Sequence, residues 1–229
     1  MLVLAIGAHP DDETMFAGGM LARYAAAGHD VYILLTTRGE GGDVGEPPLC
    51  SREELGALRE QEARNAAAAL HAQKVMFLPF VDPLVGPDDT LSAVDATPAA
   101  FSDAIATVIG SLLPDVILTH GSNGEYGHPQ HIFTHTAVFE ALHSLRPWQP
   151  QEVLTWCAAY PEPERPRYIN QDDPADIVLD VTPWLPQKIA AAKAYQSQHA
   201  LFLRRNPDRT LDSVVITTES FRRQERRRG

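Results

Sequence analysis

Two short stretches of this chain concentrate the side chains that bind metal ions and move protons. The first, AHPDDE, carries His9, Asp11 and Asp12 directly after an apolar run. The second, HGSNGEYGHPQH, carries His128 and His131 near the start of a helical pattern. Catalytic zinc commonly takes three protein ligands of these types and leaves one position for water. One imidazole from the second stretch, together with His9 and one carboxylate from the first, would make such a set.

A water molecule activated by a metal ion also needs a group that removes its proton. A bound ion brings the pKa of water to about 7, and a carboxylate that is not a ligand can then act as general base. Asp11 and Asp12 fit this division of labour, because adjacent residues on an extended segment point to opposite sides. The remaining histidine would stabilise the oxyanion that forms when water attacks a carbonyl. The first stretch alone is equally compatible with a turn that caps a helix, and the second stretch favours the metal site.

The two stretches meet only if the strands before them belong to one sheet. Short apolar runs bounded by loop residues predict buried strands, and helical patterns separate these runs. The expected strands are 2–7, 31–37, 74–80, 115–120, 152–160 and 176–181, and the expected helices are 14–27, 51–70, 98–113, 129–145 and 183–199. This alternation predicts an α/β fold with a Rossmann-like, mostly parallel sheet flanked by helices. Both stretches directly follow strands, so we expect both at the carboxyl edge of the sheet, where ligands bind.

Length and composition are typical of a soluble globular protein with one domain. The chain has 229 residues, 44% of them hydrophobic, and no evident repeat or linker, so we expect a single domain over 1–229 with a core in about 1–200 and a less regular segment 201–229. No window reaches the roughly 18 apolar residues of a membrane span. The start does not read as a secretory signal, and the two cysteines match no CxxC pattern. These features favour a cytoplasmic protein without disulfides.

The charge pattern disfavours a nucleic-acid partner. The net charge is −11, and basic residues concentrate only in the terminal FRRQERRRG. An acidic protein repels a phosphate backbone unless such a patch contacts it. We expect this end to be a solvated helix terminus, where arginines suit the negative end of the helix dipole. A phosphate contact is the alternative.

The two motifs, in this order, resemble those of the LmbE-like or PIG-L family of zinc-dependent N-deacetylases. The resemblance also takes in TTRGEGG after the second strand, Arg59 and Glu62 in the long helix, and DVTPWLPQKIAAAKAYQSQ, and it spans about 1–200. Members remove acetyl groups from N-acetylglucosaminyl conjugates. The resemblance therefore implies this hydrolysis, a Zn²⁺ cofactor and a small amino-sugar conjugate as substrate. A His/His/Asp set also accepts Fe²⁺. The aglycone and the state of association, homo-oligomers included, stay open.

The resemblance implies a role for each residue of the two motifs. His9, Asp12 and His131 would be the metal ligands. Asp11 would match the general base. His128 would match the histidine that stabilises the tetrahedral intermediate and protonates the leaving amine.

Two further positions follow from the same resemblance. Arg59 falls where the family has an arginine that contacts the substrate sugar. The second motif commonly reads His-Pro-Asp-His in the family, whereas here Gln130 stands at the Asp position. A neutral amide orients the preceding histidine less strongly than a carboxylate does, which weakens the expected role of His128 as an acid.

Other polar residues near the motifs allow several interpretations. We expect His135 to be a buried, hydrogen-bonded histidine rather than a ligand. His120 could orient a ligand, since ligating groups need hydrogen-bond partners. Asn123, Glu125 and Tyr126 fit a contact to substrate or ligand and ordinary loop chemistry equally well. The sequence RGEGG lacks the Gly-Lys-Ser/Thr of a phosphate loop.

Two other functions remain alternatives at this point. The same metal site would serve another amidohydrolase or an ester-cleaving enzyme. A metal-dependent sugar-binding protein without turnover is the second alternative. Asp11 argues against the second, because a binding site has no need of a carboxylate that is not a ligand.

Overall fold

The computed structural model describes residues 1–205 and 207–224. In this part of the chain, the main sheet has the strand order β3-β2-β1-β4-β5-β9-β8, and β6 and β7 form a small second sheet. The strands are β1 (Leu2–Gly7), β2 (Asp30–Thr37), β3 (Lys74–Phe80), β4 (Val116–Thr119), β5 (Glu152–Trp156), β6 (Ala158–Ala159), β7 (Asn170–Pro174), β8 (Ile177–Asp180) and β9 (Thr218–Arg223).

Helices alternate with these strands in the first two thirds of the chain. The α-helices are α1 (Asp12–Ala26), α2 (Leu55–Ala69), α3 (Pro98–Leu112), α4 (Gly124–Gly127), α5 (Pro129–Ser144), α6 (Leu185–Ala194), α7 (His199–Leu203) and α8 (Leu211–Val214). Short 3-10 turns are η1 (Pro87–Asp89), η2 (Pro166–Tyr168), η3 (Thr182–Trp184) and η4 (Gln196–Gln198). No helix in the described part of the chain has the length and apolar character of a membrane span.

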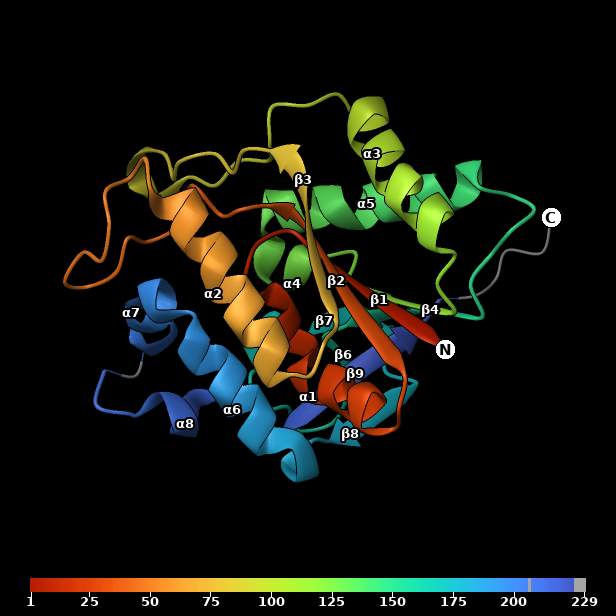
Figure 1. The fold of residues 1–229 in the computed structure, drawn as a ribbon. Coiled ribbons are helices and arrows are strands. Elements are labelled where there is room, and N and C mark those ends of the chain that lie inside the picture. Colours follow the sequence, from red (N-terminus) through yellow and green to blue (C-terminus); the bar gives the residue numbers. More distant parts are fainter. Residues whose placement is uncertain (206, 225–229) are drawn as a thin grey trace.

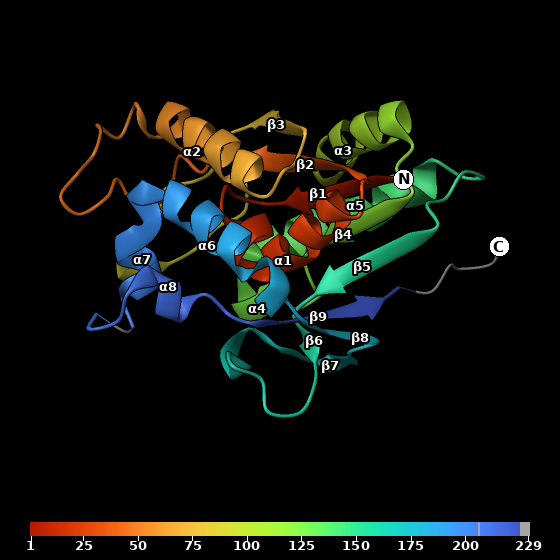
Figure 2. The same ribbon diagram turned by 60° about the horizontal axis from the view of Figure 1, so that its bottom comes forward.

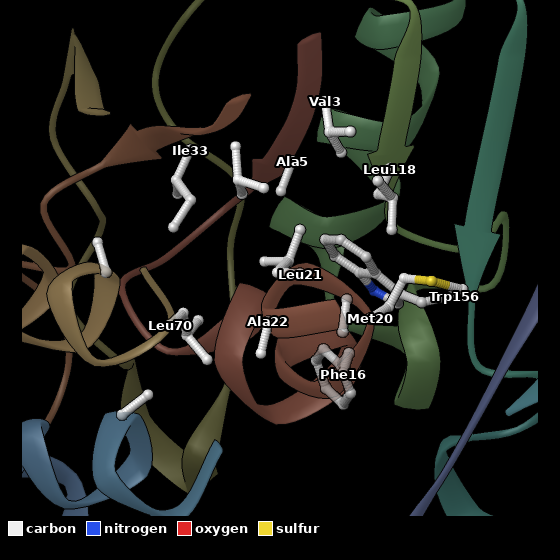
Figure 3. Close-up of a cluster of buried hydrophobic side chains, with 14 of the residues drawn as sticks. Val3, Ala5, Phe16, Met20, Leu21, Ala22, Ile33, Leu70, Leu118 and Trp156 are labelled. Carbon is white, nitrogen blue, oxygen red and sulfur yellow. The ribbon is translucent and has the colours of Figure 1, made fainter. Parts of the chain in front are cut away.

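Helices cover both faces of the main sheet (Figures 1 and 2), and β1 shows why. Val3 and Ala5 pack into a cluster with α1, α2 and α6 (Figure 3), whereas Leu4 and Ile6 pack into a second cluster with α3 and α5. Successive side chains of a strand point to opposite faces. A strand that is apolar at every position is therefore buried on both faces, as the sequence of β1 predicts.

The parallel arrangement brings the two polar motifs to the same edge. β1 pairs in parallel with β2 and with β4, and β2–β3 and β4–β5 are also parallel. Gly7 ends β1 and Thr119 ends β4, so the residues that follow each strand leave the sheet at its carboxyl edge. The predicted fold class and the predicted shared edge are confirmed.

The predicted strand over 152–160 is wrong in detail. Cys157 has φ 61° and interrupts the expected single strand, which separates β5 from β6. Residues 161–174, which lie between two expected strands, contain β7, which pairs in parallel with β6. The polar sequence of β7, NQDDP, has no apolar alternation, so this strand depends on its partner rather than on its own pattern.

The C-terminal predictions also need correction. The expected helix end at FRRQERRRG is a strand as far as Arg223: β9 pairs in antiparallel fashion with β5 and with β8. Residues far away in the sequence decide that β9 pairs as a strand, and Phe221 of β9 is fully buried. Residues 225–229 of that stretch lie outside the described residues. The expected helix over 183–199 breaks at Tyr195, whose ψ is 60°.

The predicted helix over 51–70 begins four residues late, at Leu55. The carboxylate of Glu54 accepts a hydrogen bond from the Ser51 backbone N–H at 3.1 Å, but Ser51 precedes a turn rather than the helix. This bond is one of the two hydrogen bonds of a capping box. The glycine-rich loop before it leads into the site described next.

Candidate metal centre

The residues of both motifs meet at the carboxyl edge of the sheet. His9, Asp11 and Asp12 follow β1, and His128 and His131 lie at the start of α5, after β4. This is the edge at which open α/β sheets bind their ligands. The sequence-based prediction that two distant loops meet here is confirmed.

Three side chains place their ligand atoms close together. The Nδ1 atom of His9 lies 3.2 Å from the Nε2 atom of His131. Asp12 approaches both imidazoles, with Oδ2 3.5 Å from His9 Nδ1 and Oδ1 3.3 Å from His131 Nε2. All three side chains are buried. The ring of His128 stands beside them, and its nitrogen lies within 4.8 Å of those of His9 and His131.

The outer nitrogens of the two imidazoles fix where their protons lie. The Nε2 atom of His9 lies 3.1 Å from a carboxylate oxygen of Asp82, and the Nδ1 atom of His131 lies 2.6 Å from an oxygen of Glu125. A carboxylate accepts, so each of these nitrogens carries a proton. The lone pairs on His9 Nδ1 and His131 Nε2 then face each other and the oxygens of Asp12.

This inward-facing set of acceptors fits a small divalent cation. Without a cation or an added proton, acceptor atoms 3.2–3.5 Å apart repel one another. Ligands that surround zinc tetrahedrally at 2.0–2.1 Å lie about 3.4 Å from each other, which is close to these separations. Although burial lowers the pKa of His9, the carboxylates of Asp82 and Asp12 raise it to about 10. The surroundings thus attract positive charge to this point.

Asp11 lies beside this set, held by its own partners. Its backbone has φ 116°, a strained value for a residue with a Cβ, and its N–H donates to the carboxylate of Glu13 at 3.2 Å. Arg59 donates to its side chain at 3.1 Å. Burial raises the pKa of Asp11 to about 8, against the opposing effect of Arg59. This value suits a group that accepts and releases a proton near neutral pH.

His128 is a neutral hydrogen-bond donor in this arrangement. Its ring stacks on that of His131, with centroids 4.3 Å apart and planes inclined by 9°. Burial, with further effects of His131 and His9, lowers its pKa to about 2. Its Nδ1 accepts from the backbone N–H of Gln130 at 3.2 Å, so the proton lies on Nε2.

Gln130 serves a structural purpose at the position where the family commonly has an aspartate. Its side chain is fully buried, accepts from the Val94 N–H at 2.7 Å and donates to the Thr36 hydroxyl at 3.3 Å. It therefore joins α5 to β2 and to the loop after β3. The side chain is engaged there rather than at His128.

Arg59 explains two of the three glycines of RGEGG. The guanidinium is 3% exposed and donates to Gly39 O at 2.9 Å as well as to Asp11. A Cβ added at Gly39 or at Gly42 would lie 2.2 or 2.3 Å from its Nη1 atom. Gly39 and Gly42 thus leave the space that Arg59 occupies, while a Cβ at Gly41 would lie 2.0 Å from the Pro83 carbonyl oxygen. The sugar contact implied for Arg59 remains a prediction, and the contacts seen here are to Asp11 and the loop backbone.

The structure shows the hydrogen-bond partners of His120 and His135. His120 Nδ1 lies 2.9 Å from Glu125, and its Nε2 accepts from the Ala8 N–H at 2.9 Å. His135 Nδ1 bonds to the His120 carbonyl at 2.8 Å, which confirms a hydrogen-bonded rather than ligating histidine. His135 is half-buried rather than buried.

Sequence reasoning missed three residues that support the site. Asp82, which bonds to His9, lies two residues after β3, and only its position after a parallel strand could have indicated it. Glu13 accepts from the hydroxyl of Tyr195 at 2.6 Å. Tyr195 belongs to a segment far along the chain, so no local pattern links the two.

A cavity of about 590 Å³ opens above these residues. Its lining includes the two motifs, Gly41 and Gly42, residues of the loop after β3 such as Leu84, and residues around η2 such as Tyr168. α7 closes it with Phe202. Its size is within the range of small-molecule sites.

Curated relatives are similar to this chain over much of its length. A deacetylase of Rhodococcus opacus (strain B4), named for 1D-myo-inositol 2-acetamido-2-deoxy-alpha-D-glucopyranoside, is 39% identical over 155 residues, 61% of this chain and 52% of that protein. A deacetylase of the same description from Saccharopolyspora erythraea is 32% identical over 240 residues, 88% of this chain and 78% of that protein. The chain thus spans about half the length of the first of these relatives.

Solved structures share the fold. The N,N'-diacetylchitobiose deacetylase of Pyrococcus horikoshii superimposes with a TM-score of 0.73 at 19% identity, covering 97% of this chain and 83% of the other. Residues 4–142 match the family described as PIG-L, GlcNAc-PI de-N-acetylase. That range contains most of β1, all of β2 to β4 and both motifs. The chain belongs to the PIG-L family.

Proposed function

We propose that this chain is a metal-dependent hydrolase that removes the acetyl group from an N-acetylglucosaminyl conjugate. The observation that carries the proposal is the meeting of His9, Asp12 and His131 at the floor of the cavity. A non-ligand carboxylate, that of Asp11, stands beside them. The relatives named for an acetamido-sugar substrate support the choice of acetyl group and sugar.

His9, Asp12 and His131 would hold the ion, which we propose is Zn²⁺. A divalent ion there supplies a Lewis acid that polarises the acetyl carbonyl and makes water a usable nucleophile at neutral pH. Fe²⁺ suits the same ligands.

Asp11 would accept the proton of the attacking water on its carboxylate and return it to the departing amine. Its raised pKa favours this return, and Arg59 keeps the carboxylate oriented. His128, with its proton on Nε2, would donate a hydrogen bond to the oxyanion. Because its pKa is lowered to about 2, His128 stays neutral, and protonation of the amine falls to Asp11.

The test is release of acetate from N-acetylglucosaminyl inositol, N,N'-diacetylchitobiose and N-acetylglucosamine by the purified chain. We expect release from at least one of them, its loss after chelation, and recovery after addition of Zn²⁺ or Fe²⁺. Binding of these sugars without any release would favour the sugar-binding alternative. Hydrolysis of acetate esters, with no release of acetate from these amides, would favour the ester-cleaving alternative.

A further inference from the structure

Glu125 directs a buried carboxylate at two histidines of the centre. It lies in the short turn α4 and is 1% exposed, and its backbone adopts φ 60° and ψ −56°. Such a backbone is strained for a residue with a Cβ and needs support from its surroundings. Asn123 provides support, since its Oδ1 accepts from the Glu125 N–H at 3.0 Å. The strain is thus maintained at a point where the side chain turns inward.

One oxygen of this carboxylate receives both imidazoles. Oε2 lies 2.9 Å from His120 Nδ1 and 2.6 Å from His131 Nδ1, while Oε1 accepts from the Gly121 N–H at 3.0 Å. All three partners can donate, which matches the acceptor-only character of a carboxylate. Every hydrogen-bonding direction used here is consistent with an ionised Glu125.

His120 gives an independent indication of the proton positions. The Ala8 backbone N–H can only donate, and it points to His120 Nε2 at 2.9 Å. In a neutral His120 the proton must then lie on Nδ1, where it faces Glu125. This bond also fixes the backbone just before His9. Glu125 is therefore connected to both loops of the centre, through His131 directly and through His120 to the end of β1.

We infer that Glu125 is a positioning residue that keeps the proton of His131 on Nδ1, so that the Nε2 lone pair faces the divalent ion. The inference rests on the proposed metal-dependent function. A ligating imidazole needs such a partner at its other nitrogen to fix its tautomer and orientation. Its carboxylate also adds negative charge close to the proposed ion.

An isosteric amide would disturb this arrangement in either orientation. With the amide oxygen at the position of Oε2, the NH₂ group meets the Gly121 N–H, and two donors face each other. With the NH₂ group at that position, both imidazoles must move their protons to Nε2. The second arrangement removes the His131 lone pair from the centre.

The test compares the zinc affinities of metal-free wild type, Glu125→Gln and a control, each titrated against a chromophoric chelator. We expect Glu125→Gln to weaken the affinity about 10- to 100-fold, the usual effect of removing a partner of a ligating residue. The control is Glu62→Gln: Glu62 is also buried, and it accepts from the N–H and hydroxyl of Ser197 without contact to a proposed ligand. Its zinc affinity should equal that of wild type. Equal affinities for Glu125→Gln and wild type would overturn the inference.

A measurement on wild type covers the case in which Glu125→Gln does not fold. In zinc-loaded protein with ¹⁵N-labelled histidine, NMR should locate the proton on Nδ1 of both His120 and His131. A proton on Nε2 of either residue would overturn the inference.

Acetate release from the same samples separates this inference from the proposed function. Zinc binding that depends on Glu125, without any deacetylation, would overturn the proposed function and leave the role of Glu125 unchanged. Deacetylation by wild type, with an unchanged zinc affinity in Glu125→Gln, would support the proposed function and overturn the role of Glu125. A wild type that binds no divalent ion would overturn both.

Discussion

The loops after β1 and after β4 both supply side chains to the centre, and they are held by different means. In the β1 loop, the partners come from distant parts of the chain: Arg59 on α2 donates to Asp11, and Asp82 after β3 bonds to His9. In the β4 loop, the partner of His131 is Glu125, only six residues away. The loop after β1 is held by contacts that form only in the assembled fold, whereas the loop after β4 is held mostly by contacts within itself.

The difference separates two kinds of expected defect. Among the remote partners of the β1 loop, Arg59 contacts Asp11 rather than a proposed ligand, so changing Arg59 should affect proton transfer and the stability of the whole fold. Partners within the β4 loop orient a proposed ligand, so changing them should affect metal affinity first. Variants of each loop can therefore test this difference.

The largest effect is expected for Asp11→Asn. The amide keeps the shape but cannot accept a proton, so kcat should fall about 10²- to 10⁴-fold, the usual contribution of a general acid–base group. Zinc content should stay at the wild-type level, because Asp11 is not among the proposed ligands. Steady-state kinetics with metal analysis of the same sample measures both. Near-wild-type turnover, or loss of zinc together with activity, would contradict the assignment.

Arg59→Lys should have the next largest effect. Lysine keeps the charge but cannot reproduce the fork that reaches both Gly39 and Asp11. Losing hydrogen bonds to a charged group costs about 1.5–3 kcal/mol, which we expect in the free energy of unfolding. We also expect a lower kcat with little change in KM. A raised KM with kcat preserved would instead support the sugar contact implied by the family resemblance.

Tyr195→Phe tests the remote support more gently. It removes the hydroxyl that donates to Glu13, whose carboxylate in turn accepts from the Asp11 N–H. We expect the free energy of unfolding in urea to fall by about 1 kcal/mol, because Glu13 keeps its bond from Thr14. A slight fall in kcat should accompany it, with zinc affinity unchanged. Unfolding at the wild-type midpoint would show that this contact contributes nothing.

The smallest change in stability is expected for Asn123→Ala in the β4 loop. The variant removes the acceptor for the Glu125 N–H, at a cost of about 0.5–1 kcal/mol. Because this turn holds Glu125 inward, zinc affinity should fall more clearly than stability does. Wild-type zinc affinity in Asn123→Ala, together with a changed kcat, would contradict the proposed difference between the two loops.

Local patterns predicted the part of the molecule that lies between β1 and α5. Continuous apolar runs such as 2–7 mark strands buried on both faces, and Pro129 and Pro98 mark helix starts that the structure confirms. The meeting of the motifs followed from parallel topology alone. These features depend on neighbouring residues or on general rules of sheet connection.

The remainder depends on contacts between residues far apart in the sequence. β9 becomes a strand because β5 and β8 offer it edges, although its arginines indicated a helix end. Asp82 and Tyr195 reach the site only after folding, from the loop after β3 and from the end of α6. Gln130 looked like a weakened catalytic motif, whereas its contacts to Val94 and Thr36 show a structural tie.

The proposed metal site can be tested most directly by anomalous diffraction from crystals of the zinc-loaded chain, with data on both sides of the zinc edge. We expect one strong peak between His9 Nδ1, His131 Nε2 and the carboxylate of Asp12, with Asp11 outside the coordination of the ion. A peak at other residues, or zinc-loaded crystals without any peak at this edge of the sheet, would show that the proposed metal site is wrong.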